Sequence, residues 1–412
     1  MLAARVTTPI AVLGAGLQGA SVALALAARG RQVRLLERRA APLLAASRGN
    51  EGKIHLGFVY AIDRSGATGR RMLEGALSFA PLLERWCGPL PWETWRSEGF
   101  VYAVMPDSIE NADGLEEAYA RLKDAFPDIA RSFRFAPHYI GRPLDWFFRR
   151  GHGPRGRPAV NGIPVTNVFD TEEVSVDTRE LGDALTHRLI HHPLIDLRCN
   201  VHVRSAERRG GGFRLHLETP EGASTLDADE VVNCTWEDRD RIDQTVGVPH
   251  DSSLCYRVKH RAYVKLRAGM GNLAPVTMVQ GPYGDVVPFR DGLVYISWYP
   301  ECRTYFDAVP PVQDLHDERE AFAVAHRSLD VLSEMFPALR GAEVVTSSAC
   351  PIVARGSTDV EDPASGLHER NRFGPREYDG WWTVDTGKLT TAPLNGETVA
   401  ARITRETNCV VV

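Results

Sequence analysis

Three glycines near the beginning of the chain could bind the phosphates of a dinucleotide. Gly14, Gly16 and Gly19 have the spacing G-x-G-x-x-G. In this pattern the first glycine makes a tight turn, the second lets the backbone approach a pyrophosphate, and the third allows a helix to pack closely on a strand. Glu37 follows 18 residues after Gly19, where a carboxylate can accept hydrogen bonds from ribose hydroxyls. These residues predict a dinucleotide site; the alternative is a glycine-rich turn in another α/β protein.

Such a site needs a strand before the glycines and a helix after them. Residues 10–13 are apolar, residues 20–29 are rich in alanine and leucine, Gly30 can end a helix, and residues 33–36 are apolar again. This order is typical of a strand, helix and strand that form a βαβ unit. The amides at the start of the helix, with the positive end of its dipole, would bind the phosphates.

Later segments predict a return to the first sheet and a second, antiparallel sheet. Apolar segments between residues 195 and 233 predict the returning strands, and alternating segments between 257 and 299 predict the antiparallel ones. The irregular stretch at 127–167, with an arginine- and glycine-rich run at 149–158, predicts a solvated loop that links the two lobes. The fold class is therefore α/β, with a discontinuous Rossmann-like domain of residues 1–90, 168–250 and 343–412. An α+β substrate domain with the antiparallel sheet would comprise residues 91–167 and 251–342.

Composition excludes several classes of protein. The 412 residues are 43% hydrophobic and 25% charged, with a formal net charge of −5, so we expect no nucleic-acid partner. We find no run of about 18 apolar residues and no apolar secretion segment, which argues against a membrane span and an export signal. The seven cysteines are scattered without a C-x-x-C pair, so we expect a cytoplasmic protein without a metal site or disulfide framework.

The segment AASRGNEGKIHLGFVY at residues 45–60 resembles the D-amino-acid-oxidase-like superfamily of FAD enzymes. This superfamily includes sarcosine oxidase, glycine oxidase and 2-hydroxyglutarate dehydrogenase, and the last has the most similar pattern. The matching residues are Asn50, Gly52, Ile54, His55, Gly57 and Tyr60. The resemblance implies that this segment lies along the FAD.

Two further segments extend the resemblance. Residues 177–233 resemble the second part of the FAD-binding domain, and GKLTTAPLNG at 387–396 resembles the closing turn of sarcosine oxidases. In that turn Lys388 matches a lysine that reaches a substrate carboxylate. Together with the glycine turn, the resemblance implies the following FAD-binding residues: Gly14, Ala15, Gly16, Leu17, Gln18, Glu37, Arg38, Ser47, Asn50, Gly52, Lys53, Ile54, Val203, Thr235, Trp236, Gly387, Lys388, Leu389 and Thr390.

A flavin that accepts a hydride needs few catalytic side chains around it. His55 is the candidate base, because imidazole titrates near neutral pH; the alternative is that it only contacts the flavin or packs the loop. Arg355 matches a carboxylate-binding arginine of some relatives, and the alternative is an exposed surface arginine. We expect noncovalent FAD, with a covalent link through Cys350 or His55 as the alternative. In the predicted strand around Lys259, alternation places Arg257, Lys259 and Arg261 on one face.

These features leave more than one substrate open. The leading hypothesis is oxidation of a small anionic, carboxylate-bearing substrate, either an amino acid or secondary amine or a 2-hydroxy acid. The His55 segment favours the hydroxy acid and Lys388 favours the amine. A second hypothesis is a tailoring enzyme for a larger or carrier-bound intermediate, with the unmatched residues 93–167 forming its site. A third is an NAD-binding or non-catalytic protein. The electron acceptor could be oxygen or another molecule.

Overall fold

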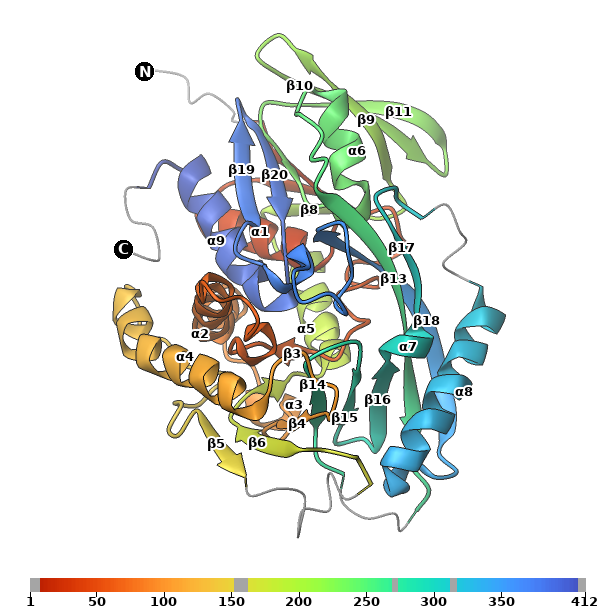
Figure 1. The fold of residues 1–412 in the computed structure, drawn as a ribbon. Helices are drawn as coiled ribbons and strands as arrows, with labels where there is room; N and C mark the ends of the chain where they lie inside the picture. Colours follow the sequence, from red (N-terminus) through yellow and green to blue (C-terminus); the bar gives the residue numbers. More distant parts are fainter. Residues whose placement is uncertain (1–7, 152–161, 269–272, 312–316, 407–412) are drawn as a thin grey trace.

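The computed structural model describes residues 8–151, 162–268, 273–311 and 317–406 (Figure 1). Residues 152–161 of the predicted solvated loop lie outside these described residues. The prediction is wrong for much of the rest of 127–167, because helix α4 (Ala112–Ser132) and strand β5 (Phe148–Gly151) extend into it and Tyr139 and Ile140 are buried. Within the described ranges, no helix combines the length and the apolar character needed to cross a membrane.

A six-stranded sheet contains the predicted βαβ unit. Its strands lie in the order β19-β20-β12-β1-β2-β8, and all neighbours are parallel except β19 and β20. Their bounds are β1 (Ile10–Leu13), β2 (Val33–Leu36), β8 (Ile195–Arg198), β12 (Val231–Asn233), β19 (Gly374–Tyr378) and β20 (Trp381–Asp385). Because side chains alternate along a strand, Ile10 and Val12 pack in one hydrophobic cluster and Ala11 and Leu13 in another. Both faces of the sheet are therefore covered, as is usual for parallel strands.

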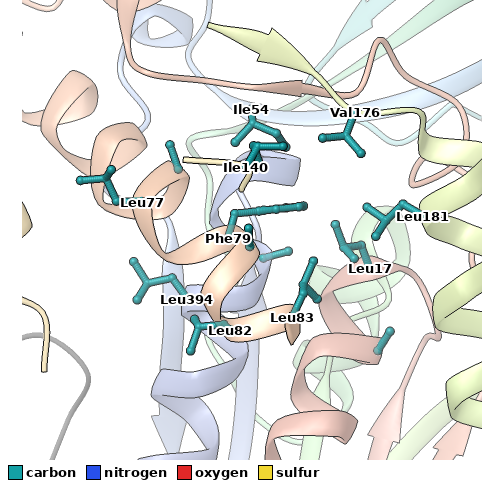
Figure 2. Packing of buried hydrophobic residues seen from close by; sticks show 14 of the residues in the cluster. Leu17, Ile54, Leu77, Phe79, Leu82, Leu83, Ile140, Val176, Leu181 and Leu394 are labelled. Atoms are coloured by element: carbon teal, nitrogen blue, oxygen red, sulfur yellow. The ribbon is translucent and has the colours of Figure 1, made fainter. Parts of the chain in front are cut away.

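Several helices share the cluster that contains Ile10 and Val12. They include α1 (Leu17–Ala27), α2 (Ala67–Cys87), α4 (Ala112–Ser132), α5 (Thr178–Ile190) and α9 (Ala392–Ile403). Figure 2 shows Leu17 of α1, Leu83 of α2 and Leu181 of α5 in this cluster. Every residue of α1 is buried. The surrounding packing therefore fixes the position of α1 and of the glycine turn from which it starts.

The opposite face of the six-stranded sheet is covered by a three-stranded antiparallel sheet and a short helix. These elements are β9 (His202–Arg209), β10 (Gly212–Thr219), β11 (Gly222–Ala228) and α6 (Arg239–Thr245). Phe213 of β10 and Ile242 of α6 join the cluster of Ala11 and Leu13, and Phe213 contacts Trp381 at a ring distance of 5.2 Å.

A nine-stranded sheet forms the other part of the molecule. It runs in the order β17-β13-β16-β15-β14-β4-β6-β5, and β18 pairs with β13. The bounds are β4 (Val101–Val104), β5 (Phe148–Gly151), β6 (Asn167–Thr171), β13 (Leu254–Lys265), β14 (Val276–Val279), β15 (Gly284–Pro288), β16 (Leu293–Trp298), β17 (Arg303–Asp307) and β18 (Glu343–Arg355). All described pairs are antiparallel except β4 with β14. Helix α8 (Glu318–Met335) packs against this sheet (Figure 1).

Strand β18 changes one predicted boundary. The sequence assigns residues 343–412 to the first domain, whereas residues 343–355 pair with β13 along its whole length, from Leu254 with Arg355 to Lys265 with Glu343. This pairing joins segments that are distant in the sequence, so no local pattern indicates it. We propose the same division into two domains with β18 moved to the second. The remaining elements are β3 (Lys53–Ile54), β7 (Val174–Ser175), α3 (Trp92–Trp95), α4 (Ala112–Ser132) and α7 (Tyr299–Cys302).

Candidate active site

A cavity of about 840 Å³ extends from the glycine turn to the nine-stranded sheet. This volume lies within the roughly 300–1,000 Å³ typical of ligand and cofactor sites. Most of the predicted site residues line it: Gly14, Gly16, Leu17, Gln18, Glu37, Arg38, Ser47, Asn50, Lys53, His55, Val203, Thr235, Trp236, Gly387, Lys388 and Leu389. Five predicted residues do not line it: Ala15, Gly52, Ile54, Thr390 and Arg355.

The glycine turn has the close contacts that its spacing predicts. Gly14 has a φ of +83°, and a Cβ there would lie 2.9 Å from the carbonyl oxygen of Cys234. A Cβ on Gly19 would lie 1.8 Å from the carbonyl oxygen of Gly14. Gly16 is the N-cap of α1 and lines the cavity. The positive end of the α1 dipole therefore faces the cavity, as an anion site requires.

Glu37 organises this turn from the end of β2. One carboxylate oxygen accepts a hydrogen bond from the backbone amide of Ala15 at 2.8 Å, and the other accepts one from the amide of Arg39 at 2.9 Å. Each carboxylate oxygen can accept a second hydrogen bond. The predicted ribose contact thus stays compatible with this geometry, while Ala15 contributes its backbone amide to the turn. Arg38 pairs with Asp238 at 2.8 Å.

The segment at residues 45–60 is held against the first turn of α1 and against β7. Ser47 Oγ accepts a hydrogen bond from the amide of Leu17 at 2.8 Å, and Asn50 Oδ1 accepts one from the amide of Gly52 at 2.7 Å. A Cβ on Gly52 would lie 1.9 Å from the carbonyl oxygen of Val176. Glycine is therefore required at Gly52 so that this segment can pack against Val176. Gly52 itself does not line the cavity.

His55 faces a buried carboxylate. Its Nδ1 lies 3.6 Å from Glu173 Oε1, and both side chains are almost completely buried. The amide of His55 donates to Thr390 Oγ1 at 2.9 Å, so Thr390 acts as a support. Glu173 Oε2 accepts a hydrogen bond from the amide of Leu56 at 2.6 Å, and its Oε1 accepts one from the hydroxyl of Tyr102.

Burial lowers the pKa of His55, and this outweighs the opposite effect of the Glu173 carboxylate. A neutral imidazole at the cavity wall can accept a proton, and the role of His55 as a base stays a prediction. No sequence pattern predicts a role for Glu173. The only local signal is that Glu172 and Glu173 stand next to each other between Val168 and Val176, in a segment that mixes apolar and polar residues.

Lys53 lies at the cavity but is engaged with protein groups. Its ammonium lies 2.6 Å from Asp285 Oδ1 and 4.4 Å from the ring centroid of Phe100. Thr277 Oγ1 donates to the same Asp285 oxygen at 2.8 Å. Burial would raise the pKa of Asp285, but Lys53 and Lys259 lower it overall. Lys53 and Asp285 therefore form a buried ion pair in the cavity wall.

The face of β13 that carries Arg257, Lys259 and Arg261 lines the cavity. Arg257 pairs with Asp359 at 3.0 Å, and the ammonium of Lys259 lies 4.5 Å from the ring centroid of Tyr299. Arg370 and Lys388 add two further cations to the cavity wall. Cationic side chains thus surround this end of the cavity, which suits an anionic ligand.

The structure does not bring Arg355 to the cavity. Its guanidinium pairs with Asp251 at 2.8 Å and with Asp385 at 3.3 Å, and it lies 4.8 Å from the ring centroid of Phe373. Since two carboxylates already satisfy it, Arg355 stabilises the end of β18. Arg370 lies in the cavity instead and was not predicted.

Cys350 lines the cavity, as one alternative for a covalent flavin requires. Burial raises the pKa of its thiol, and Arg261 only partly opposes this. A protonated thiol is a weak nucleophile, so this environment favours noncovalent binding.

The fold and the cavity define a dinucleotide-dependent enzyme. The glycine turn and Glu37 form one end of the cavity, and the sheet that carries the cations forms the other. A family model described as FAD dependent oxidoreductase matches residues 9–402. The chain therefore belongs to this family of FAD-dependent oxidoreductases, as the resemblance at residues 45–60 predicts. A Cβ would lie 2.9 Å from the Cys234 carbonyl oxygen at Gly14 and 3.2 Å from Ser47 Oγ at Gly16, so the two glycines fit the close backbone approach that this cofactor needs.

Several solved structures share the fold over nearly the whole chain. Glycine oxidase from Geobacillus kaustophilus aligns with a TM-score of 0.69 and 19% identity, over 98% of this chain and 96% of that chain. An L-amino acid deaminase from Proteus vulgaris aligns with a TM-score of 0.67 and 14% identity, over 100% and 93%. L-alpha-glycerophosphate oxidase from Mycoplasma pneumoniae, with FAD bound, aligns with a TM-score of 0.67 and 13% identity, over 98% and 97%. A search of curated proteins finds no significant match.

Glu37→Gln tests the role of Glu37 in holding the turn. The substitution replaces one acceptor oxygen by an NH₂ group, so one of the two backbone amides loses its partner. We expect the free energy of unfolding to fall by about 1–3 kcal/mol and FAD to bind more weakly. Urea unfolding of the apoprotein and fluorescence titration with FAD measure the two effects. Glu207→Gln on the exposed side of β9 is the charge-matched control; equal behaviour of both variants would contradict this role.

Proposed function

We propose that this enzyme oxidises a small carboxylate-bearing substrate at a carbon that carries an amine or a hydroxyl. The observation that supports the proposal most is Lys388. Its ammonium faces the cavity, and among the described residues it has no hydrogen-bond or ion-pair partner. An unpaired ammonium that is partly removed from water is stabilised by an anionic ligand.

In this proposal His55 accepts a proton from the substrate. Its imidazole is neutral because burial lowers its pKa, and Glu173 orients the ring from behind. FAD, when bound, supplies the hydride acceptor. The remaining requirement is an anchor for the substrate carboxylate, which Lys388 and Arg370 provide from the cavity wall.

The second hypothesis, a larger or carrier-bound substrate, loses its main support. It relied on residues 93–167 as an extended site. The described residues of this stretch form α3, β4, α4 and β5, and none of them lines the cavity. The described part of the stretch therefore contributes to the core and to the nine-stranded sheet, which supports the small substrate.

Anaerobic reduction of the holoenzyme tests the proposal. We expect the flavin absorbance to bleach with at least one member of a panel of glycine, N-methylglycine, proline, lactate and 2-hydroxyglutarate. Readmission of air then distinguishes the acceptor, because an oxidase regains its colour within seconds and a dehydrogenase does not. If none of these compounds bleaches a flavin that dithionite reduces normally, the proposed substrate class is wrong.

A further inference from the structure

One carboxylate in the cavity lacks a protein partner. Five acidic side chains line the cavity within the described residues: Glu37, Glu51, Glu237, Asp238 and Asp285. Four of them accept hydrogen bonds from backbone amides, from Arg38 or from Lys53. Glu51 is the exception. Across the described part of the chain, its carboxylate has no hydrogen-bond donor and no lysine or arginine nitrogen within 4.0 Å.

The backbone on both sides of Glu51 is held in place. Asn50 Oδ1 accepts a hydrogen bond from the amide of Gly52, and Asn50 Nδ2 donates one to the carbonyl oxygen of Ala46 at 2.8 Å. The close approach of Gly52 to Val176 fixes the other side. Glu51 therefore lines the cavity from a well-packed segment.

Glu51 is ionised in this environment. Burial alone would raise its pKa, but the positive charges of Lys259, Lys388 and Lys53 lower it overall. The opposite effect acts on Lys388, because burial lowers the pKa of its ammonium and Glu51 only partly opposes this. The cavity thus contains a carboxylate and an ammonium that influence each other without forming an ion pair.

These two groups match the charges of an amino acid. We propose that Glu51 is a specificity-determining residue that binds the cationic amine of the substrate, while Lys388 binds the substrate carboxylate. The proposal rests on the proposed function and decides between its two substrate classes. A 2-hydroxy acid would pair with Lys388 but leave Glu51 unpaired, and buried groups without partners oppose binding of such an analogue. Lys259 is less available than Lys388 because it already lies over the ring of Tyr299.

A pair of compounds that cannot be oxidised separates binding from catalysis. 2-Aminoisobutyrate and 2-hydroxyisobutyrate have the same shape and carboxylate, and neither has a hydrogen on the carbon that would be oxidised. Titration of the oxidised holoenzyme, followed by the change in flavin absorbance, gives a Kd for each. We expect the amine to bind roughly 10- to 100-fold more tightly than the alcohol, and Glu51→Gln to reduce this ratio to about one. Glu51→Asp should keep part of the preference, because it keeps the charge.

The outcomes are distinct from those of the flavin-reduction experiment. Glu117→Gln on the exposed face of α4 is the matched control and should bind both compounds as the unchanged enzyme does. An unchanged enzyme that binds the alcohol as tightly as the amine, or binds neither, would overturn the assignment of Glu51. So would a Glu51→Gln variant with an unchanged ratio and a normal flavin spectrum. The reduction panel with oxidisable substrates tests the proposed function independently.

Discussion

Gly19→Ala is expected to destabilise the folded protein by about 3 kcal/mol, and to leave it without bound flavin. Gly19 lies within α1, where alanine by itself would favour the helix by about 1 kcal/mol. However, the added Cβ would lie 1.8 Å from the carbonyl oxygen of Gly14. Both groups belong to the backbone of the phosphate-binding turn, so neither can move without opening the turn or displacing α1. The steric term therefore outweighs the helix propensity.

Gly30→Ala is the matched control for this prediction. Gly30 follows the same helix and has a φ of +72°, but no atom lies within 4 Å of the position of its Cβ. We expect Gly30→Ala to lower the free energy of unfolding only by the cost of placing alanine at a positive φ, about 1–2 kcal/mol. Urea unfolding and the ratio of flavin to protein absorbance after purification measure both variants. Full flavin content and normal stability in Gly19→Ala would show that the turn and helix pack less closely than the structure indicates.

Lys53→Met is expected to lower the free energy of unfolding by about 3–5 kcal/mol. The substitution keeps an apolar side chain beside Phe100 but removes the ammonium from its ring and leaves Asp285 without its main counter-charge. The side chain of Lys53 is 2% exposed and that of Asp285 is 11% exposed, so water cannot replace the lost partner. Lys259 remains within the electrostatic range of Asp285, which places the expected loss toward the lower end.

The stability lost in Lys53→Met should depend on pH, because the Asp285 carboxylate titrates. In the unchanged protein the pKa of Asp285 is lowered, so the pair contributes stability above the unfolded-state pKa of about 3.9, and this is lost as the pH falls. In Lys53→Met we expect burial to raise the pKa instead, so the loss should be larger at pH 8 than at pH 5. The double variant Lys53→Met/Asp285→Leu should regain much of the stability, because it removes both charges of the buried pair and so leaves neither of them without its partner. A double variant less stable than the single one would contradict this account.

Local patterns in the sequence were sufficient to predict the class of protein. The G-x-G-x-x-G spacing specifies its own strand, turn and helix, because the positive φ of Gly14 and the close approach of Gly19 to the Gly14 carbonyl both belong to one turn. Alternation along β13 likewise separated Arg257, Lys259 and Arg261 from their neighbours. The family match over residues 9–402 agrees with what the segment around His55 resembles.

Only the tertiary structure decided which charges are free to bind a ligand. Lys53 and Arg355 have the residue types of a binding site, but Asp285 and Asp251, distant in the sequence, pair with them. Glu51 showed no local signal, and its importance comes from the absence of a partner among the described residues around it. Pairing of buried charges depends on strands brought together across the fold, such as β3 with the nine-stranded sheet. The sequence by itself therefore determined the cofactor and its turn, while the contacts between distant segments decided the substrate end of the cavity.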